Sequence, residues 1–161
     1  MWTANRFLVT LLLVFFAGGA FAQTTCSGSN TSLSLGVYPS YNASAVDSSG
    51  PFTVTCNTGQ GGGGSVSVMV GLGPSFNSGS ITTRSMKLTT GADLLDYNLY
   101  RDPTRLAVWG QTVGVDTMTQ SVNTSNNNTG SATFTFFGRI NALQDIRAGD
   151  YSDTVIITVT F

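Results

Sequence analysis

Apolar and polar residues alternate with a period of two along most of this chain. Such alternation is typical of β-strands that turn one face toward a core and the other toward solvent. No stretch of normal helix length shows the competing 3.6-residue period. The pattern predicts strands over seven segments: residues 32–38, 51–56, 65–72, 94–100, 106–109, 132–137 and 154–161.

Runs of glycine, serine and asparagine separate these segments, as expected of connections between strands. The clearest runs cover residues 59–64, 74–80 and 123–130. Short strands at such spacings, with no helical pattern between them, predict two antiparallel sheets packed face to face. The expected fold is all-β, an antiparallel sandwich related to the immunoglobulin architecture.

The amino-acid composition excludes several kinds of catalytic and binding site. Only 9% of the residues are charged, and the chain contains no histidine. Histidine-dependent nucleophilic triads and histidine-ligated zinc are therefore excluded. A formal net charge of −1, without a basic run, also argues against nucleic acid as a partner.

The aspartates do not form a convincing catalytic or metal-binding set. Asp93 and Asp96 are separated only by two leucines and favour a solvated strand edge over a glycosidase acid pair. Asp145, Asp150 and Asp153 do not match the spacing of an EF-hand calcium loop. The sequence therefore predicts no enzyme activity, no catalytic residue, no metal site and no cofactor.

The first 22 residues have the pattern of a secretory signal peptide. Arg6 precedes a largely apolar run, and Ala20-Phe21-Ala22 supplies a small-residue cleavage site. The run is shorter than the ~20 residues that span a bilayer, and no later segment is long enough to do so. We expect a cleaved leader over residues 1–22 and one exported domain, without a membrane span, over residues 23–161.

Export to an oxidising compartment bears on the state of the two cysteines of the chain, Cys26 and Cys56. An oxidising compartment favours disulfide formation, and each of the two cysteines has only the other as a partner. We therefore predict one disulfide between Cys26 and Cys56. In the chain-entropy model, a bridge that closes a loop of this length stabilises a fold by roughly 3–4 kcal/mol.

The most regular of the predicted strands, residues 154–161, lacks the features that usually protect a sheet edge. It contains no charge, no proline and no glycine, and an undefended apolar edge is a site of association. Either an earlier strand of the same chain covers this edge, or another chain covers it by β-strand addition. The residues alone leave both alternatives open.

An ordered set of short motifs resembles the spore coat protein U domain family, which includes subunits of archaic, Csu-type chaperone–usher pili. The match extends over nearly the whole exported part of the chain. It rests on Cys26, Val54-Thr55-Cys56, Arg84-Ser85-Met86, Leu99-Tyr100-Arg101-Asp102, Trp109-Gly110, Phe137-Gly138-Arg139, Gly149-Asp150-Tyr151-Ser152-Asp153-Thr154 and Val159-Thr160-Phe161.

The resemblance implies an incomplete immunoglobulin-like sandwich that lacks its final strand, and the family's disulfide maps onto Cys26 and Cys56. It further implies a groove that a periplasmic chaperone fills first and the N-terminal strand of a neighbouring subunit fills later. An usher would be a further partner, and the protein would reach a pilus, the cell surface or a spore coat through the periplasm. The implied groove residues are Leu33, Leu35, Val37, Val155, Ile157, Val159 and Phe161.

One departure from the family pattern bears on the role in a fibre. Pilus subunits of this type carry a donor segment before the first cysteine, whereas only Gln23, Thr24 and Thr25 lie between the expected cleavage site and Cys26. Three residues span at most ~11 Å. The sequence therefore predicts a secreted structural protein that accepts a strand but donates none, as a tip or cap does. The other possibility is a secreted coat protein that completes its own sandwich and does not polymerise.

A binding module is the alternative to this structural role. Tyr38, Tyr41, Tyr100, Tyr151 and Trp109 could form a face on which sugar rings stack. On that reading, the protein is an autonomous β-sandwich that binds surface carbohydrate.

Overall fold

The structure is a computed structural model that describes residues 23–29, 31–41, 43–59, 63–125 and 128–161. The predicted leader, residues 1–22, lies outside the described residues. Within them no helix is long and apolar enough to cross a membrane. The strands are β1 (Thr25–Gly28), β2 (Val46–Asn57), β3 (Ser65–Ser75), β4 (Arg84–Leu88), β5 (Leu94–Tyr100), β6 (Met118–Asn123), β7 (Thr129–Ile140), β8 (Tyr151–Ser152) and β9 (Val155–Thr160).

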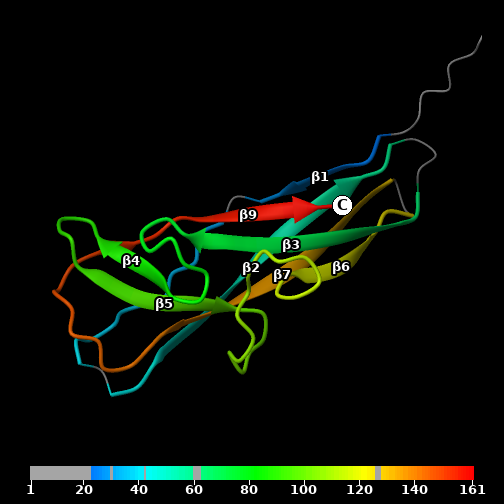
Figure 1. Ribbon diagram of the computed structural model, residues 1–161. Coiled ribbons are helices and arrows are strands. Elements are labelled where there is room, and N and C mark those ends of the chain that lie inside the picture. The colour runs from blue at the N-terminus through cyan, green and yellow to red at the C-terminus, as the bar shows by residue number, and fades with distance from the viewer. Residues whose placement is uncertain (1–22, 30, 42, 60–62, 126–127) are drawn as a thin grey trace, which may run out of the picture.

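These strands form two sheets, and every pairing between them is antiparallel. The larger sheet has the order β1-β2-β7-β5-β4-β8, and the smaller has the order β6-β3-β9. Figure 1 shows β3 and β9 lying across the long β2–β7 pair. The predicted all-β antiparallel sandwich is confirmed.

The core lies between the inner faces of the two sheets. Alternate residues of β2 and β7, among them Phe52 and Phe134, face the alternate valines of β3. Between the sheets lies Trp109, which is completely buried and whose indole N–H donates to the Val70 carbonyl at 3.0 Å. Its ring lies against those of Phe134 and Phe136. The period-two alternation thus identifies the core residues correctly in strands whose inner face packs against the opposite sheet.

A buried cation joins the two sheets. The side chain of Arg84, on β4, is completely buried, and its Nη1 donates to Asn98 Oδ1 on β5 at 2.6 Å. Its Nη2 donates to the carbonyl of Gly73 on β3 at 2.8 Å and to that of Trp109 at 2.9 Å. Burial lowers the pKa of Arg84. Carbonyl and amide oxygens, rather than a carboxylate, satisfy its donors.

Two of the predicted strands are wrong. Residues 32–38 are extended but belong to neither sheet. Gly36, with φ of +86°, turns the chain away from the strand direction within that segment. Residues 106–109 form only an isolated bridge between Val108 and Tyr100. Here the chain forms a tight loop at Asp102 before it reaches Trp109, so no ladder can extend.

The structure also contains four strands that the alternation did not predict: β1, β4, β6 and β8. Each is short, and β4 carries the arginine described above at an inward position, which breaks the apolar pattern. The strand β6 carries mostly threonine, serine, glutamine and asparagine. A hydrophobic period detects such strands poorly because packing and pairing, rather than apolar content, hold them in the sheet.

The predicted disulfide between Cys26 and Cys56 is confirmed. The two cysteines are directly opposite each other in the β1–β2 pair. Because β1 has four residues and pairs only with β2, it is a weak edge strand by itself. The bridge therefore fixes the first strand to the sheet beside the groove described below.

Candidate functional site: an open groove between the two sheets

The strand β9 lies at an edge of the smaller sheet. One of its edges pairs with β3, in a register that runs from Met69↔Thr160 to Ser75↔Val155. Among the described residues no strand pairs with its other edge. A row of backbone N–H and C=O groups is therefore exposed along β9, with no charge, proline or glycine to protect it.

The inward side chains of β9 are incompletely covered. Val155, Ile157 and Val159 point toward the core but are only half-buried. On the neighbouring strand β3, the inward residues Val70 and Leu72 are 0% and 1% exposed. Both strands belong to the same sheet and carry the same kind of side chain. The difference shows that the apolar core is open at β9.

Two cavities, of about 430 and 450 Å³, lie along this opening. They share Thr31, Val155 and Ile157, and together we call them the groove. One end of the groove reaches Gly28 and Ser29, and the other reaches residues 151–154. Its floor and walls also include Leu33, Leu35, Phe52, Leu72, Met86, Tyr97, Leu99, Phe136 and Val159.

The wall opposite β9 is the segment that follows β1, and Thr31 of this segment lines both cavities. Two glycines of the larger sheet make room for its leucines. A Cβ added to Gly138 would lie 2.4 Å from Leu35 Cδ2, and one added to Gly50 would lie 2.9 Å from Leu33 Cδ1. Both leucines can therefore lie directly on the backbone of β2 and β7.

Two side-chain hydrogen bonds, one from the larger sheet and one from the wall itself, hold this wall in place without a ladder. Ser48 Oγ donates to the Ser34 carbonyl at 2.7 Å, and Thr31 Oγ1 donates to the Pro51 carbonyl at 3.2 Å. The backbone of residues 31–35 is thereby tied to β2 at two points. No sheet ladder includes the backbone of this segment.

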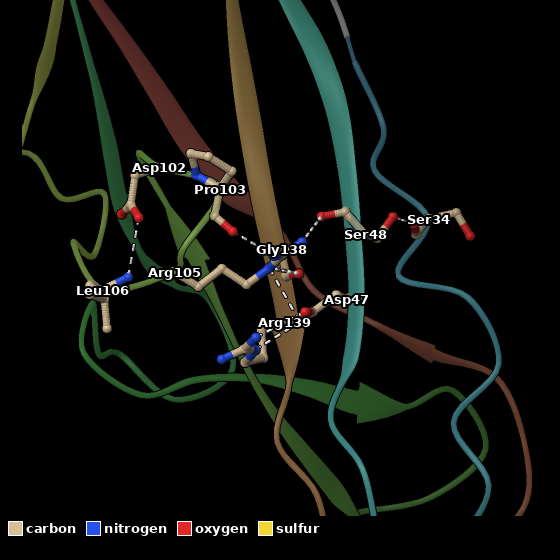
Figure 2. A network of polar contacts seen from close by, with 9 residues as sticks. All are labelled: Ser34, Asp47, Ser48, Asp102, Pro103, Arg105, Leu106, Gly138 and Arg139. Carbon is tan, nitrogen blue, oxygen red and sulfur yellow. Dashed lines mark hydrogen bonds and ion pairs between the residues drawn. The ribbon is translucent and has the colours of Figure 1, made fainter.

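Figure 2 shows that Ser48 also belongs to a network of charged side chains on β2 and β7. Arg105 Nη2 donates to the Ser48 carbonyl at 3.4 Å, and Arg105 Nε lies 3.2 Å from Asp47 Oδ1. Arg139 donates to both carboxylate oxygens of Asp47, at 2.7 and 2.9 Å. The hydrogen bond from Arg139 lowers the pKa of Asp47. These contacts fix the β2–β7 pair where it supports Ser34.

A carboxylate at the start of the loop positions Arg105. Asp102 accepts hydrogen bonds from the Thr104 hydroxyl and, at 2.9 Å, from the Ala107 N–H. These bonds lower the pKa of Asp102 to about 2. Arg105 itself has a φ of +59°, which a residue without a special role rarely adopts. The loop therefore closes on Asp102 and directs the Arg105 side chain onto β2 and β7.

The far end of the groove is polar. Asp153 faces inward in the same row as Val155, and its Oδ2 accepts a hydrogen bond from the Tyr97 hydroxyl at 2.8 Å. Asn77 Nδ2 donates to Asp153 Oδ1 at 3.0 Å. Burial is the largest cause that raises the pKa of Tyr97, followed by the hydrogen bond to Asp153. Tyr97 is therefore a neutral hydroxyl at the groove surface.

The structure brings together five of the seven residues that the sequence assigned to a groove: Leu33, Leu35, Val155, Ile157 and Val159. The other two do not line it. Val37 follows the turn at Gly36 and is 87% exposed, and Phe161, beyond the end of β9, is 54% exposed.

Sequence reasoning missed the polar end of the groove and most of its floor. The floor comes from β2, β3, β4, β5 and β7, whose contribution depends on how the sheets pack. The polar end had a signal, because Tyr151, Asp153 and Val155 have the same parity as the rest of the β9 row. Extending the alternation backward across Thr154 would have reached Asp153.

Other candidate residues lie elsewhere and make structural contacts. Asp93 forms an ion pair with Arg147 at 3.6 Å, and Asp96 Oδ1 accepts a hydrogen bond from Ser85 Oγ at 2.6 Å. Within the described parts of the chain, no group of three or more metal-binding side chains is close enough to hold an ion. Trp109 is completely buried, so it is not available for stacking on a sugar.

The sequence model of the spore coat protein U domain matches residues 11–158. The chain belongs to the spore coat protein U domain family. A curated relative, Protein U of Myxococcus xanthus, is 32% identical over 92 residues, which are 56% of this chain and 48% of that protein. The chain thus spans about half the length of this relative.

A chain of one solved complex shares the fold of this spore coat protein U domain. The CsuC–CsuE chaperone–tip adhesion subunit pre-assembly complex of archaic Csu pili from Acinetobacter baumannii contains a chain that aligns with a TM-score of 0.54. The alignment covers 86% of this chain and 40% of that chain, at 20% identity. A chain of a chaperone–tip adhesin complex of CFA/I fimbriae aligns with a TM-score of 0.44, at 17% identity over 82% of this chain and 39% of that chain.

Proposed function

We propose that this chain is a non-catalytic structural subunit of a pilus or cell-surface coat, whose groove accepts a β-strand from another protein. The observation that carries the proposal is the incomplete burial of Val155, Ile157 and Val159 on an edge with which no strand of the described residues pairs. Core-facing apolar surface that remains exposed forgoes the free energy of burial, roughly 25 cal/mol per Å². A partner that covers this surface restores that stabilisation.

An extended peptide fits this opening better than any other kind of ligand. The uncovered side chains recur every second residue along β9, which is the spacing at which a neighbouring strand presents its own side chains. The exposed backbone groups of β9 supply main-chain hydrogen bonds, and the cavities supply pockets for alternate side chains. Affinity and specificity thus have separate sources in one site.

The identity of the strand donor is inferred from the family and the fold. The solved chain of similar fold comes from a complex of a chaperone with a tip adhesion subunit. By analogy, we expect a periplasmic chaperone to fill the groove before assembly, and a neighbouring subunit to fill it afterwards. An usher and a surface location follow from the same analogy.

Our finer proposal is that this subunit accepts a strand and donates none. If the leader is cleaved after Ala22, only three residues precede Cys26, and they span at most ~11 Å. Such a segment is too short to fill a groove that follows the whole of β9. A subunit of this kind would occupy the tip or cap of a head-to-tail fibre.

The proposal predicts that an alternating strand stabilises the exported protein. The probe is a peptide of about nine residues that alternates valine and threonine, with an extended length of about 30 Å. It is fused through a Gly-Ser linker to maltose-binding protein, and we call it the Val–Thr probe. At 100 times its Kd, binding adds about 2.7 kcal/mol to the free energy of unfolding. For a domain of this size, that corresponds to a rise in Tm of roughly 8 °C, measured by calorimetry.

The matched control has the same composition in the order Val-Val-Thr-Thr, which removes the period of two. It should raise Tm by less than about 2 °C, because half of its valines would point away from the groove. The proposal would be contradicted if both probes raised Tm equally, or if neither probe raised it.

A further inference from the structure

A single carboxylate interrupts the apolar row that faces the groove. Residues 151, 153, 155, 157 and 159 all face inward by the alternation of exposure along the chain. The last three are valine and isoleucine, and Asp153 lies directly before them. An aspartate is rarely placed in a core-facing row unless a partner satisfies it.

Only neutral groups donate hydrogen bonds to this carboxylate. The Tyr97 hydroxyl donates to Oδ2 at 2.8 Å, and the side-chain amide and backbone N–H of Asn77 donate to Oδ1 at 3.0 and 3.4 Å. The described residues contain three ion pairs, and Asp153 takes part in none of them. Arg84 acts on Asp153 through space but gives its hydrogen bonds to Asn98 and to backbone carbonyls. The negative charge at the end of the groove therefore lacks a cation in contact with it.

These contacts also have a structural role. Asn77 Nδ2 donates to the Ser85 and Ser152 carbonyls as well, so this one side chain links its own segment to two others. The donors reach both carboxylate oxygens, but none of them carries a positive charge. A carboxylate that lines the cavity, with its charge unpaired, is costly unless a cation approaches it.

We propose that the strand which fills the groove carries a lysine or arginine at the inward position beside Asp153, after a row of apolar inward residues. This inference rests on the proposed function and specifies its partner. The cation would displace water from the polar end and form a charge-assisted hydrogen bond with Asp153. It would also fix the direction and register of the strand, because only one end of the groove is acidic. Apolar residues alone do not distinguish two registers that differ by two residues.

The test compares versions of the Val–Thr probe in which each inward valine in turn is replaced by lysine or by methionine. Methionine matches the length of lysine without its charge. With the wild-type protein, lysine at one terminal inward position should bind about tenfold more tightly than methionine there. At central positions, lysine should bind at least 30-fold more weakly, because Val155 and Ile157 would surround it. Isothermal titration calorimetry measures each Kd.

The variants D153N and D150N separate the contact from general electrostatics. D153N removes the charge at the groove, and the preference for lysine should fall below threefold. D150N removes an exposed carboxylate that does not line either cavity, and the tenfold preference should remain. Should D153N fail to fold, the salt dependence of the wild-type protein replaces it. The lysine preference should shrink between 50 and 500 mM NaCl, while binding of the methionine probe changes less than twofold.

The outcomes distinguish this inference from the proposed function. If methionine and valine probes bind, but lysine is preferred at no position, the inference is wrong and the groove still accepts strands. A lysine preference that persists in D153N, or that salt leaves unchanged, also overturns it. If no probe binds, both the inference and the proposed function are wrong.

Discussion

Replacement of Ile157 by aspartate is expected to abolish capture of the Val–Thr probe. Ile157 lies at the centre of the inward row and lines both cavities of the groove. A docked strand would bury the new carboxylate among Val155, Leu72 and its own valines, without a partner. Burial of an unpaired charge costs several kcal/mol, so the Kd of the probe should rise by at least 100-fold. Titration calorimetry or retention on immobilised probe measures the loss.

The matched control for this prediction is I156D. Ile156 is the adjacent residue of the same strand, but it points outward and is 72% exposed. The substitution has the same chemistry on the same strand, so it should change the Kd by less than about threefold. Because the groove is open in the unbound protein, I157D should still export and form the Cys26–Cys56 disulfide. Equal binding by I157D and wild type, or an equal loss in both variants, would contradict the groove as the site of capture.

Replacement of Arg84 by methionine is expected to give the largest loss of stability. Methionine approximates the apolar length of the side chain but supplies no donor to Asn98 or to the carbonyls of Gly73 and Trp109. The two carbonyls would lose these buried donors, and Asn98 Oδ1 would keep only its hydrogen bond from the Leu99 N–H. Removal of one member of such a buried polar network costs about 3–5 kcal/mol. Urea denaturation should show this as a lower midpoint with an unchanged slope.

Arg101 provides the control for Arg84, since it is also an arginine with a hydrogen bond to a backbone carbonyl but is only partly buried. Its Nη1 donates to the Thr117 carbonyl at 3.2 Å, while its buried Nε has no hydrogen-bond partner. R101M should therefore cost less than about 1.5 kcal/mol. R84K keeps one charge but reaches fewer acceptors, and it should lie between R84M and wild type. An R84M midpoint equal to that of wild type would show that the network does not hold the two sheets together.

The sequence predicted those parts of the fold in which local pattern and tertiary packing agree. The alternation over β2, β3, β5 and β7 identified strands whose inward residues are now seen in the core. It failed at residues 32–38, whose leucines alternate like those of a strand but rest against Gly50 and Gly138. An apolar residue at every second position indicates that alternate side chains are buried. Such burial does not require the backbone to be hydrogen-bonded in a β-ladder.

The family resemblance implied the groove only along β9 and its facing segment. Within each of these two segments the alternation of side chains is local and can be followed along the sequence. The floor is assembled from five other strands, and the network around Asp47 joins residues that are far apart along the chain. No local pattern encodes such contacts. Val37 continues the alternation of Leu33 and Leu35, but the positive φ of Gly36 turns the chain between them. Val37 is therefore exposed and does not line the groove.

Amide hydrogen exchange along β9 tests most directly whether this strand is an open edge that accepts another. In the protein alone, the N–H groups of Val155–Thr160 that point away from β3 should exchange at least 100-fold faster than those bonded to it. With the Val–Thr probe at saturation, these amides should become as protected as the rest of the strand. Protection of every β9 amide before the probe is added, or continued fast exchange at saturation, would contradict the account.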